Sequence, residues 1–293
     1  MALDFGAGCV GGAAGVIVGQ PFDTVKVRLQ VQHGKNGMYK GVLDCVTKMI
    51  KQESMTSLYK GMTPPLLGLA FQNAIIFGLQ GQFRTLTDGS IRGELIAGSV
   101  TGGVQAGITA PIELAKIRLQ IQGTGGRISP EQRKYKGPIQ TVLKIRQEEG
   151  SRSCFRGLFG VLLRDVPATA IYFGSFAYLN SKFIPAGGTI DSLSAAHLLF
   201  TGGCAGMLSW AALYPIDVIK TRIQAEGMAP HGRYKSYFHC FVQSVKEEGY
   251  MWATRGFGAT MLRAFPVNGA ILATVTLVLR FMKTNDEELI FED

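Results

Sequence analysis

Charged residues are scarce in this sequence: they make up 17% of its 293 residues, whereas hydrophobic residues make up 46%. Soluble domains carry about a quarter charged residues, so this balance favours a helical membrane protein. The five cysteines show no C-x-x-C motif and the four histidines no ligand spacing, so we expect neither a disulfide framework nor a metal site. No signal-peptide pattern opens the sequence, and we expect any organelle address to be internal.

Basic residues are unevenly distributed. Of the 30 Lys and Arg, 23 fall in the windows 26–60, 116–156 and 220–255, and each window separates two apolar stretches. Such an excess in alternate loops is typical of membrane proteins, whose basic loops stay on one side of the bilayer. The distribution of these basic residues therefore indicates how the chain is oriented in a membrane. We do not interpret the net charge of +9 as a sign of nucleic-acid binding.

A ten-residue string occurs three times, as PFDTVKVRLQ (21–30), PIELAKIRLQ (111–120) and PIDVIKTRIQ (215–224). A second motif, YKG at 39–41, recurs as YKG at 135–137 and YKS at 234–236, with offsets of 96 and 99 residues. Self-similarity at a fixed period indicates a repeat architecture. We place the repeats at 1–88, 89–187 and 188–283, followed by an acidic tail at 284–293 that we expect to be disordered.

Each repeat is predicted to contain a long helix, a short amphipathic helix and a second long helix. The long helices are expected at 5–32, 63–84, 93–122, 159–182, 194–225 and 258–282, and the short ones at 41–52, 137–148 and 236–247. About 20 residues of helix span a bilayer core. Glycines at four-residue spacing, such as Gly11/Gly15 and Gly202/Gly206, favour close helix packing. The predicted fold is an all-α membrane protein with six transmembrane helices in three pseudo-threefold repeats around a central cavity.

The proline strings predict a gate. Pro21, Pro111 and Pro215 should kink the odd-numbered helices, so that three helices converge at one end of the bundle. An acid and a base three residues apart share a helix face, and in a ring the acid of one repeat can meet the base of the next. The expected pairs are Asp23 with Lys116, Glu113 with Lys220 and Asp217 with Lys26, and the amides of Gln30, Gln120 and Gln224 are expected to brace them. Water-accessible pairs contribute about 0–1 kcal/mol each, which predicts a weak lock.

The string P-x-[D/E]-x-x-[K/R], followed by [D/E]-G-x-x-x-x-aromatic-[K/R]-G, resembles the mitochondrial carrier family over essentially the whole chain. The resemblance implies a multi-pass protein of the mitochondrial inner membrane with both termini toward the intermembrane space, a matrix gate at the proline strings, and alternating access to one central site. It also implies bound cardiolipin near Gly61, Gly157 and Gly256, and no other cofactor. Ser54 and Thr254 depart from the motif. The even-numbered helices lack a clear outer-gate motif, so we expect a weak cytoplasmic gate.

The predicted substrate site lies where the threefold pattern breaks. Seven residues after Gly61, Gly157 and Gly256 stand Gly68, Arg164 and Arg263, and Asp165 follows Arg164. Charges inside membrane helices usually face a cavity and have a function. We expect Asp165 to attract a substrate cation while the two arginines hold a carboxylate, with Gly68 leaving space and Asn73 and Asn268 as further polar contacts. The alternative is an Arg164–Asp165 pair that only neutralises itself.

A ligand with both a carboxylate and a positive group is an amino acid or a betaine. The predicted function is transport of arginine, lysine and ornithine, with carnitine or acylcarnitine as the alternative. A proton or fatty-acid uncoupler on the same fold and a non-cycling receptor are more distant alternatives. No enzyme is expected, because no nucleophile with a base and no metal set is present in the sequence. One three-repeat bundle would enclose a complete pathway, so we expect a functional monomer.

Overall fold

The computed structural model describes residues 2–34, 37–69, 91–126, 130–183, 193, 195–226 and 233–291, and all regular secondary structure in these residues is helical. The first repeat contains α1 (Ala2–Val31), α2 (Val42–Gln52), the 3-10 helix η1 (Met55–Tyr59) and helical residues 63–69. The second contains α4 (Ile91–Ile121), η2 (Pro130–Gln132), α5 (Pro138–Glu149), η3 (Ser151–Phe155) and α6 (Leu158–Ser181). The third contains α7 (Ala195–Ala225), α8 (Tyr237–Glu248), η6 (Gly249–Thr254) and α9 (Phe257–Phe291). The all-helical prediction is confirmed for this part of the chain.

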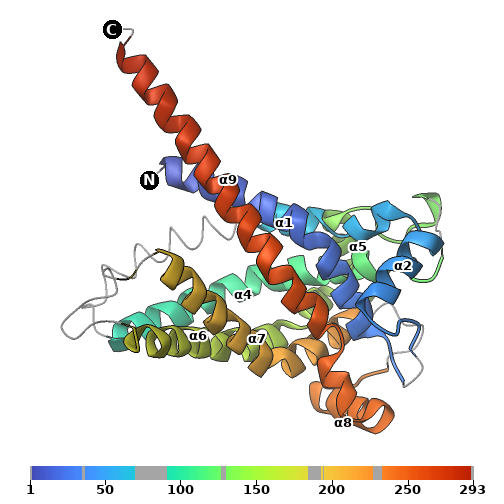
Figure 1. Cartoon of the computed structure of the whole chain (residues 1–293). Helices are drawn as coiled ribbons and strands as arrows, with labels where there is room; N and C mark the ends of the chain where they lie inside the picture. The colour runs from blue at the N-terminus through green and yellow to red at the C-terminus, as the bar shows by residue number, and fades with distance from the viewer. Residues whose placement is uncertain are drawn as a thin grey trace.

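α1 packs along α9 and α6 packs along α7, and the short helices α2, α5 and α8 gather at the end away from the two termini (Figure 1). Pro21, Pro111 and Pro215 lie inside α1, α4 and α7, which continue through them. The short helices begin where the repeated motif predicts. Pro138 occupies the first turn of α5, and the Ser236 hydroxyl caps α8 by accepting a hydrogen bond from the backbone N–H of His239 at 3.1 Å.

Glycines on α1 allow it to pack closely against α9. A Cβ atom on Gly11 would lie 2.5 Å from a methyl carbon of Val275, and one on Gly15 would lie 2.7 Å from Ile271. Both approaches are too close for a real side chain, so the four-residue spacing of these glycines is explained by this contact. On α7, the pair Gly202/Gly206 faces the ring of Tyr172 on α6 with ordinary contact distances.

The third repeat differs from expectation at its end, and it contains a stretch that bears on the membrane. Helix α9 continues to Phe291, so residues 284–291 are helical and the expectation of a disordered tail is wrong for them. The run Glu287, Glu288 and Leu289 consists of strong helix formers, which explains the continuation. Within the described residues, one stretch, Tyr237–Val278, is long and apolar enough to cross a membrane by length and composition.

Candidate functional site

Three ion pairs join the proline strings of neighbouring repeats, in the predicted arrangement. Lys26 Nζ lies 2.7 Å from an Asp217 carboxylate oxygen, and Lys220 Nζ lies 2.5 Å from a Glu113 oxygen. Lys116 forms an ion pair with Asp23. Each acid thus meets the base of another repeat, and α1, α4 and α7 are tied together at one level.

The pairs are more buried than the sequence analysis assumed. The exposed fraction of their side chains runs from 2% for Lys220 to 23% for Glu113, and that of Asp217 is 3%. The expectation of water-accessible pairs is therefore wrong for Lys220 and Asp217, which the neighbouring helices cover, whereas the other four side chains keep 13–23% exposure. The strength of the lock stays a prediction. Removing one partner of a buried pair costs about 3–5 kcal/mol, since it leaves the other charge unpaired.

The three glutamines do not brace the pairs equally. Gln30 donates hydrogen bonds of 3.0 Å to the Asp217 carboxylate and to the Tyr214 hydroxyl, and so braces one ion pair as predicted. Gln120 instead donates to the Thr24 hydroxyl at 3.3 Å. Neither polar atom of the Gln224 amide has a hydrogen-bond partner in the described structure. The bracing prediction is thus wrong for Gln120 and Gln224, because their partners differ from repeat to repeat.

An apolar cluster lies next to the ion pairs, toward the ends of the same three helices. It consists of the buried residues Val27, Ile117 and Ala225, with Val31 and Ile121 packed against them. Val31, Ile121 and Ala225 each stand ten residues after the proline of their string, so this layer repeats with the same symmetry as the charges. Sequence analysis missed the cluster, although the shared offset from the prolines was visible.

Arg164 on α6 contacts two of the gate acids. Its guanidinium donates to Asp217 at 2.9 Å, lies 3.4 Å from Glu113, and donates from Nε to the adjacent Asp165 at 2.6 Å. The sequence suggested that Arg164 binds the carboxylate of the substrate. In this structure its guanidinium is already paired with carboxylates of the protein. The bundle brings it into the level of the gate, where the acids of α4 and α7 compete for its donors.

Arg263 on α9 occupies a corresponding place, with its Nε 3.1 Å from an Asp23 oxygen. The Asp165 side chain is 47% exposed, which leaves its carboxylate open to a ligand as well as to Arg164. Gly68 is buried, Asn268 is exposed on α9, and Asn73 lies outside the described residues. The structure thus places Arg164 and Arg263 in contact with gate acids, and Asp165 in contact with Arg164.

Trp210 on α7 is a neighbour that sequence analysis missed. Its ring centroid lies 4.7 Å from Lys26 Nζ and 5.8 Å from the central guanidinium carbon of Arg164. Trp210 stands five residues before Pro215, where α1 has Val16 and α4 has Ala106, so it also breaks the threefold pattern. An aromatic face at this place attracts cations.

Gly61, Gly157 and Gly256 precede the helical residues 63–69, α6 and α9, with positive φ angles of 71°, 100° and 80°. A Cβ atom on Gly61 would lie 2.8 Å from the Lys116 carbonyl oxygen, and one on Gly157 would lie 2.5 Å from Gln224. Both the backbone conformation and the close approach to the next repeat require glycine here. The structure therefore gives these residues a packing role, and cardiolipin binding beside them stays a prediction.

A second ring of ion pairs lies within the repeats and was also missed. Arg28, Arg118 and Arg222 each contact a glutamate at the end of the following short helix, namely Glu53, Glu149 and Glu248. The same glutamates also meet Lys60, Arg156 and Arg255. Burial raises the pKa of Glu53, but hydrogen bonds from Arg28 and Lys60 outweigh it and hold this pKa below its usual range. The arginine seven residues after each proline could have revealed this ring.

The family follows from comparison with known proteins. The mitochondrial carrier protein family matches this chain three times, over residues 1–90, 87–186 and 191–286. The chain is 45% identical to the mitochondrial basic amino acids transporter of Rattus norvegicus, over 99% of this chain and 92% of that protein. It is 39% identical to the mitochondrial arginine transporter BAC2 of Arabidopsis thaliana, over 94% and 90%, and 38% identical to the mitochondrial carnitine/acylcarnitine carrier protein of Mus musculus, over 94% and 93%.

This chain therefore belongs to the mitochondrial carrier family. Membership makes it a transporter of the mitochondrial inner membrane and not an enzyme. Each of the three matched segments contains one of the three proline strings.

Proposed function

We propose that this chain transports basic amino acids, namely arginine, lysine and ornithine, across the mitochondrial inner membrane by alternating access. The observation that carries the proposal is that Arg164, which pairs with Asp165, and Arg263 each contact gate acids. The relatives named for basic amino acids and for arginine support this substrate class. The proposal includes six membrane helices around a central cavity, with the proline strings toward the matrix.

The charges of the site favour a ligand that carries both signs. The carboxylate of an amino acid would compete with Asp23 for Arg263 and with the gate acids for Arg164, since a guanidinium binds carboxylates through paired donors. Asp165 would hold an amino group of the ligand, and the face of Trp210 would receive a cationic side chain. Gly68, Asn73 and Asn268 remain candidates for further contacts.

Ligand binding and gate opening are linked through these contacts. When a ligand carboxylate takes Arg164 or Arg263, a gate acid loses a partner, and the closed arrangement becomes less stable. Because breaking a buried pair costs about 3–5 kcal/mol, opening requires the ligand to replace contacts within the same site. Moving a two-state equilibrium from 1:99 to 99:1 takes about 5.5 kcal/mol of differential binding, a comparable quantity.

The test is uptake of radiolabelled substrates by purified protein in liposomes. Arginine, lysine and ornithine should enter preloaded vesicles, and a comparison with empty vesicles separates exchange from net import. Asp165→Asn should abolish uptake of the basic amino acids, while Glu148→Gln, in an exposed ion pair of α5 with Lys134, should leave it unchanged. Unchanged lysine uptake by Asp165→Asn would contradict the role of Asp165.

Transport of carnitine or acylcarnitine is the second candidate, favoured by the 38% identity to the carnitine/acylcarnitine carrier. The same uptake panel separates the two, because carnitine carries a quaternary ammonium in place of an amino group. Uptake of acylcarnitine without arginine or lysine would reverse the assignment. A proton leak without uptake of either class would favour an uncoupler.

The proposal also includes bound cardiolipin at Gly61, Gly157 and Gly256 and a monomeric transporter. The backbone amides at the starts of the helical residues 63–69, of α6 and of α9 favour an anionic headgroup. Native mass spectrometry of the purified protein should show one chain with retained lipid. A stable dimer without bound lipid would contradict both expectations.

A further inference from the structure

Arg263 and Arg164 stand at equivalent positions of α9 and α6, but their surroundings differ. The guanidinium of Arg164 has three acidic partners, whereas Arg263 lies beside one among the described residues, Asp23. Arg263 Nε lies 3.1 Å from an Asp23 oxygen but makes no hydrogen bond with the described residues, and 34% of the side chain is exposed. Of the two arginines, Arg263 therefore has more donors available for the carboxylate of a substrate.

Gly19 on α1 provides the space in which the guanidinium of Arg263 lies. A Cβ atom on Gly19 would lie 3.0 Å from Arg263 Nε and 3.6 Å from one of its terminal nitrogens. The first distance is shorter than an ordinary contact of about 3.5 Å, so even one methyl group would displace the guanidinium by a few tenths of an ångström. Gly19 lies inside α1 with a negative φ angle. The space, and not the backbone conformation, therefore requires glycine here.

The equivalent position in the third repeat does not carry a glycine. The residue two positions before the proline is Gly19 in α1 and Leu213 in α7. Because α6 packs along α7 as α9 packs along α1, helix packing alone does not require glycine at this position. On α6, Arg164 reaches a gate acid of α4 as well as one of α7. Arg263 instead lies over the glycine of the helix next to it, so we relate this glycine to the arginine.

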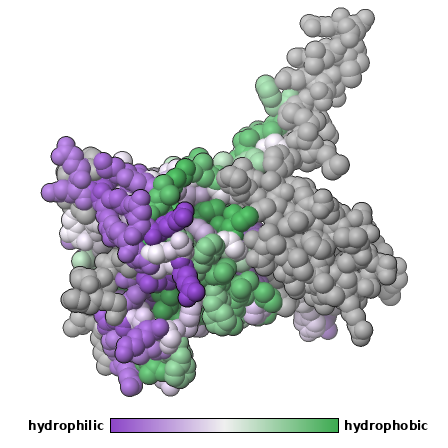
Figure 2. All heavy atoms as spheres, turned by 180° about the vertical axis from the view of Figure 1, so that it is seen from behind, coloured by the Kyte–Doolittle hydropathy of each residue, from purple (hydrophilic) through white to green (hydrophobic). Residues whose placement is uncertain are grey.

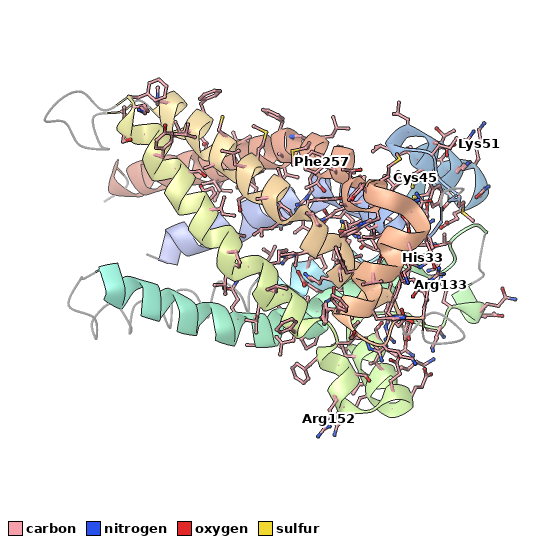
Figure 3. The ribbon with its side chains drawn as sticks, turned by 90° about the horizontal axis from the view of Figure 1, so that it is seen from below. His33, Cys45, Lys51, Arg133, Arg152 and Phe257 are labelled. Atoms are coloured by element: carbon pink, nitrogen blue, oxygen red, sulfur yellow. The ribbon has the colours of Figure 1, made fainter. Side chains whose placement is uncertain are left out.

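The surroundings of Arg263 on α9 show why it needs this space. Its neighbours Leu262 and Phe265 are 58% and 76% exposed, so one face of α9 is apolar and open. Figure 2 shows a hydrophobic band next to the hydrophilic end that carries the short helices, and Figure 3 shows α9 running back from Phe257, its first residue, beside α1. A charged side chain inside a membrane helix is stabilised away from lipid. Gly19 allows the guanidinium to lie between the two helices.

We propose that Gly19 is a positioning residue for substrate binding, which holds the guanidinium of Arg263 against α1 where it receives the carboxylate of an amino acid. This inference rests on the proposed function, in which Arg263 binds that carboxylate. Gly19 itself contacts no substrate. Misplacing a substrate-positioning group by about 1 Å can cost about 100-fold in rate. A displacement of a few tenths of an ångström should therefore weaken substrate binding several-fold.

The test is the concentration dependence of arginine uptake by Gly19→Ala in preloaded liposomes. A helix accepts alanine more readily than glycine, so the substitution acts through the space it fills. The half-saturating arginine concentration should rise at least about threefold, while the maximal rate stays within about twofold of that of the parent protein. An unchanged half-saturating concentration would overturn the proposal. Failure of Gly19→Ala to fold would also overturn it, because a clash that Arg263 can relieve by moving cannot unfold the bundle.

Two further glycines of α1 provide matched controls. Gly11→Ala also crowds the contact between α1 and α9, since its Cβ atom would lie 2.5 Å from Val275, but it does not meet Arg263. Gly8→Ala leaves this contact intact, because a Cβ atom there would meet nothing within 4 Å. Both controls should keep the half-saturating concentration of the parent protein. An equal rise in Gly11→Ala would show that helix packing, and not the position of Arg263, determines the affinity.

A double-mutant cycle shows whether Gly19 acts through Arg263. Arg263→Lys alone should raise the half-saturating arginine concentration, because an ammonium lacks the paired donors of a guanidinium, while its flexible chain can avoid an added methyl group. Adding Gly19→Ala to Arg263→Lys should then raise it by less than about 1.5-fold. Independent effects that multiply would overturn the proposal.

The single variants of the cycle separate this inference from the proposed function. If Arg263→Lys takes up arginine like the parent protein, the carboxylate role of Arg263 in the proposed function fails. If Arg263→Lys weakens uptake and Gly19→Ala does not, the proposed function stands and only the positioning role of Gly19 fails.

Discussion

The two sides of α7 that complete the gate differ in how their polar groups are paired. We call the contact between the strings of α1 and α7 the α1–α7 seam, and that between the strings of α4 and α7 the α4–α7 seam. In the α1–α7 seam, Gln30 bonds to Asp217 and Tyr214, and Arg222 Nε donates to the Gln30 carbonyl at 2.9 Å. In the α4–α7 seam, the equivalent atoms, the Gln224 amide and Arg118 Nε, have no hydrogen-bond partner in the described structure.

The α4–α7 seam receives its additional tie from elsewhere. Arg164, from the candidate substrate site on α6, contacts both Glu113 and Asp217 there. The hydrogen bond of Gln30 to Asp217 does not involve a candidate substrate residue, so substrate binding should leave it intact. The contacts of Arg164 with Glu113 and Asp217 should be lost when a substrate binds Arg164. The difference predicts that the α1–α7 seam contributes more to resting stability and that the α4–α7 seam responds more to substrate.

The largest effect is expected from Asp217→Asn. Asp217 accepts contacts from Lys26, Gln30 and Arg164, so its loss should destabilise the protein by about 3–5 kcal/mol. Glu113→Gln, the matched change in the other seam, should cost about 1 kcal/mol less, because Glu113 has no glutamine brace. Thermal unfolding can be followed by the reaction of a thiol dye with the buried Cys45, Cys154 and Cys240. A larger loss for Glu113→Gln would reverse the ranking of the seams.

A smaller and cleaner difference is expected between Gln30→Ala and Gln224→Ala. Gln30→Ala removes two hydrogen bonds, one of them to a carboxylate, and should cost about 1.5–3 kcal/mol. The Gln224 amide has no partner to lose, so Gln224→Ala should cost about 1 kcal/mol less than Gln30→Ala or even be neutral. The same thiol-dye melting curves measure both. Equal shifts in melting temperature would show that Gln224 finds a partner in solution.

The next expected difference is in stability, between lysine substitutions of Arg222 and of Arg118. Arg222→Lys and Arg118→Lys both keep a positive charge beside their glutamates. Arg222 also donates to the backbone carbonyls of Gln30 and Gln32, which a lysine cannot reproduce in the same geometry. Arg222→Lys should therefore destabilise by about 1 kcal/mol more than Arg118→Lys. Urea unfolding in detergent is a suitable measurement, and indistinguishable midpoints would contradict the difference between the seams.

The gate pairs and the short helices, which repeat threefold, could be predicted from the sequence, whereas the equally repeated ring of Arg28, Arg118 and Arg222 with their glutamates was missed. The recurring proline strings predicted the three ion pairs, and the YKG offsets predicted the short helices to within one residue, because each repeat must form the same contacts with its neighbour. What departs from threefold symmetry depends on packing between repeats. Gln30, Gln120 and Gln224 are identical residues at equivalent positions, yet Tyr214 and Thr24 give two of them different partners and the third has none. The reach of Arg164 into the gate was hidden for the same reason.

Lowering the pH is expected to have the smallest effect on the difference in stability between the two seams. Hydrogen bonding and charge from Arg118, with Arg156, lower the pKa of Glu149 below its usual 4.5, and the pKa of Glu53 is also lowered. Because the unfolded chain then binds protons more readily than the folded one, stability should be intact above about pH 4.5 and fall as the pH drops through the lower folded values. These glutamates bind within repeats, so Gln30→Ala and Gln224→Ala should lose stability in parallel as the pH falls below about 4.5. Melting curves across this range test it, with Glu53→Gln as the control, which should be less stable at pH 7 and less sensitive to acid. A difference between the two glutamine variants that shrinks with falling pH would mean that the seams, and not the glutamate ring, take up the protons.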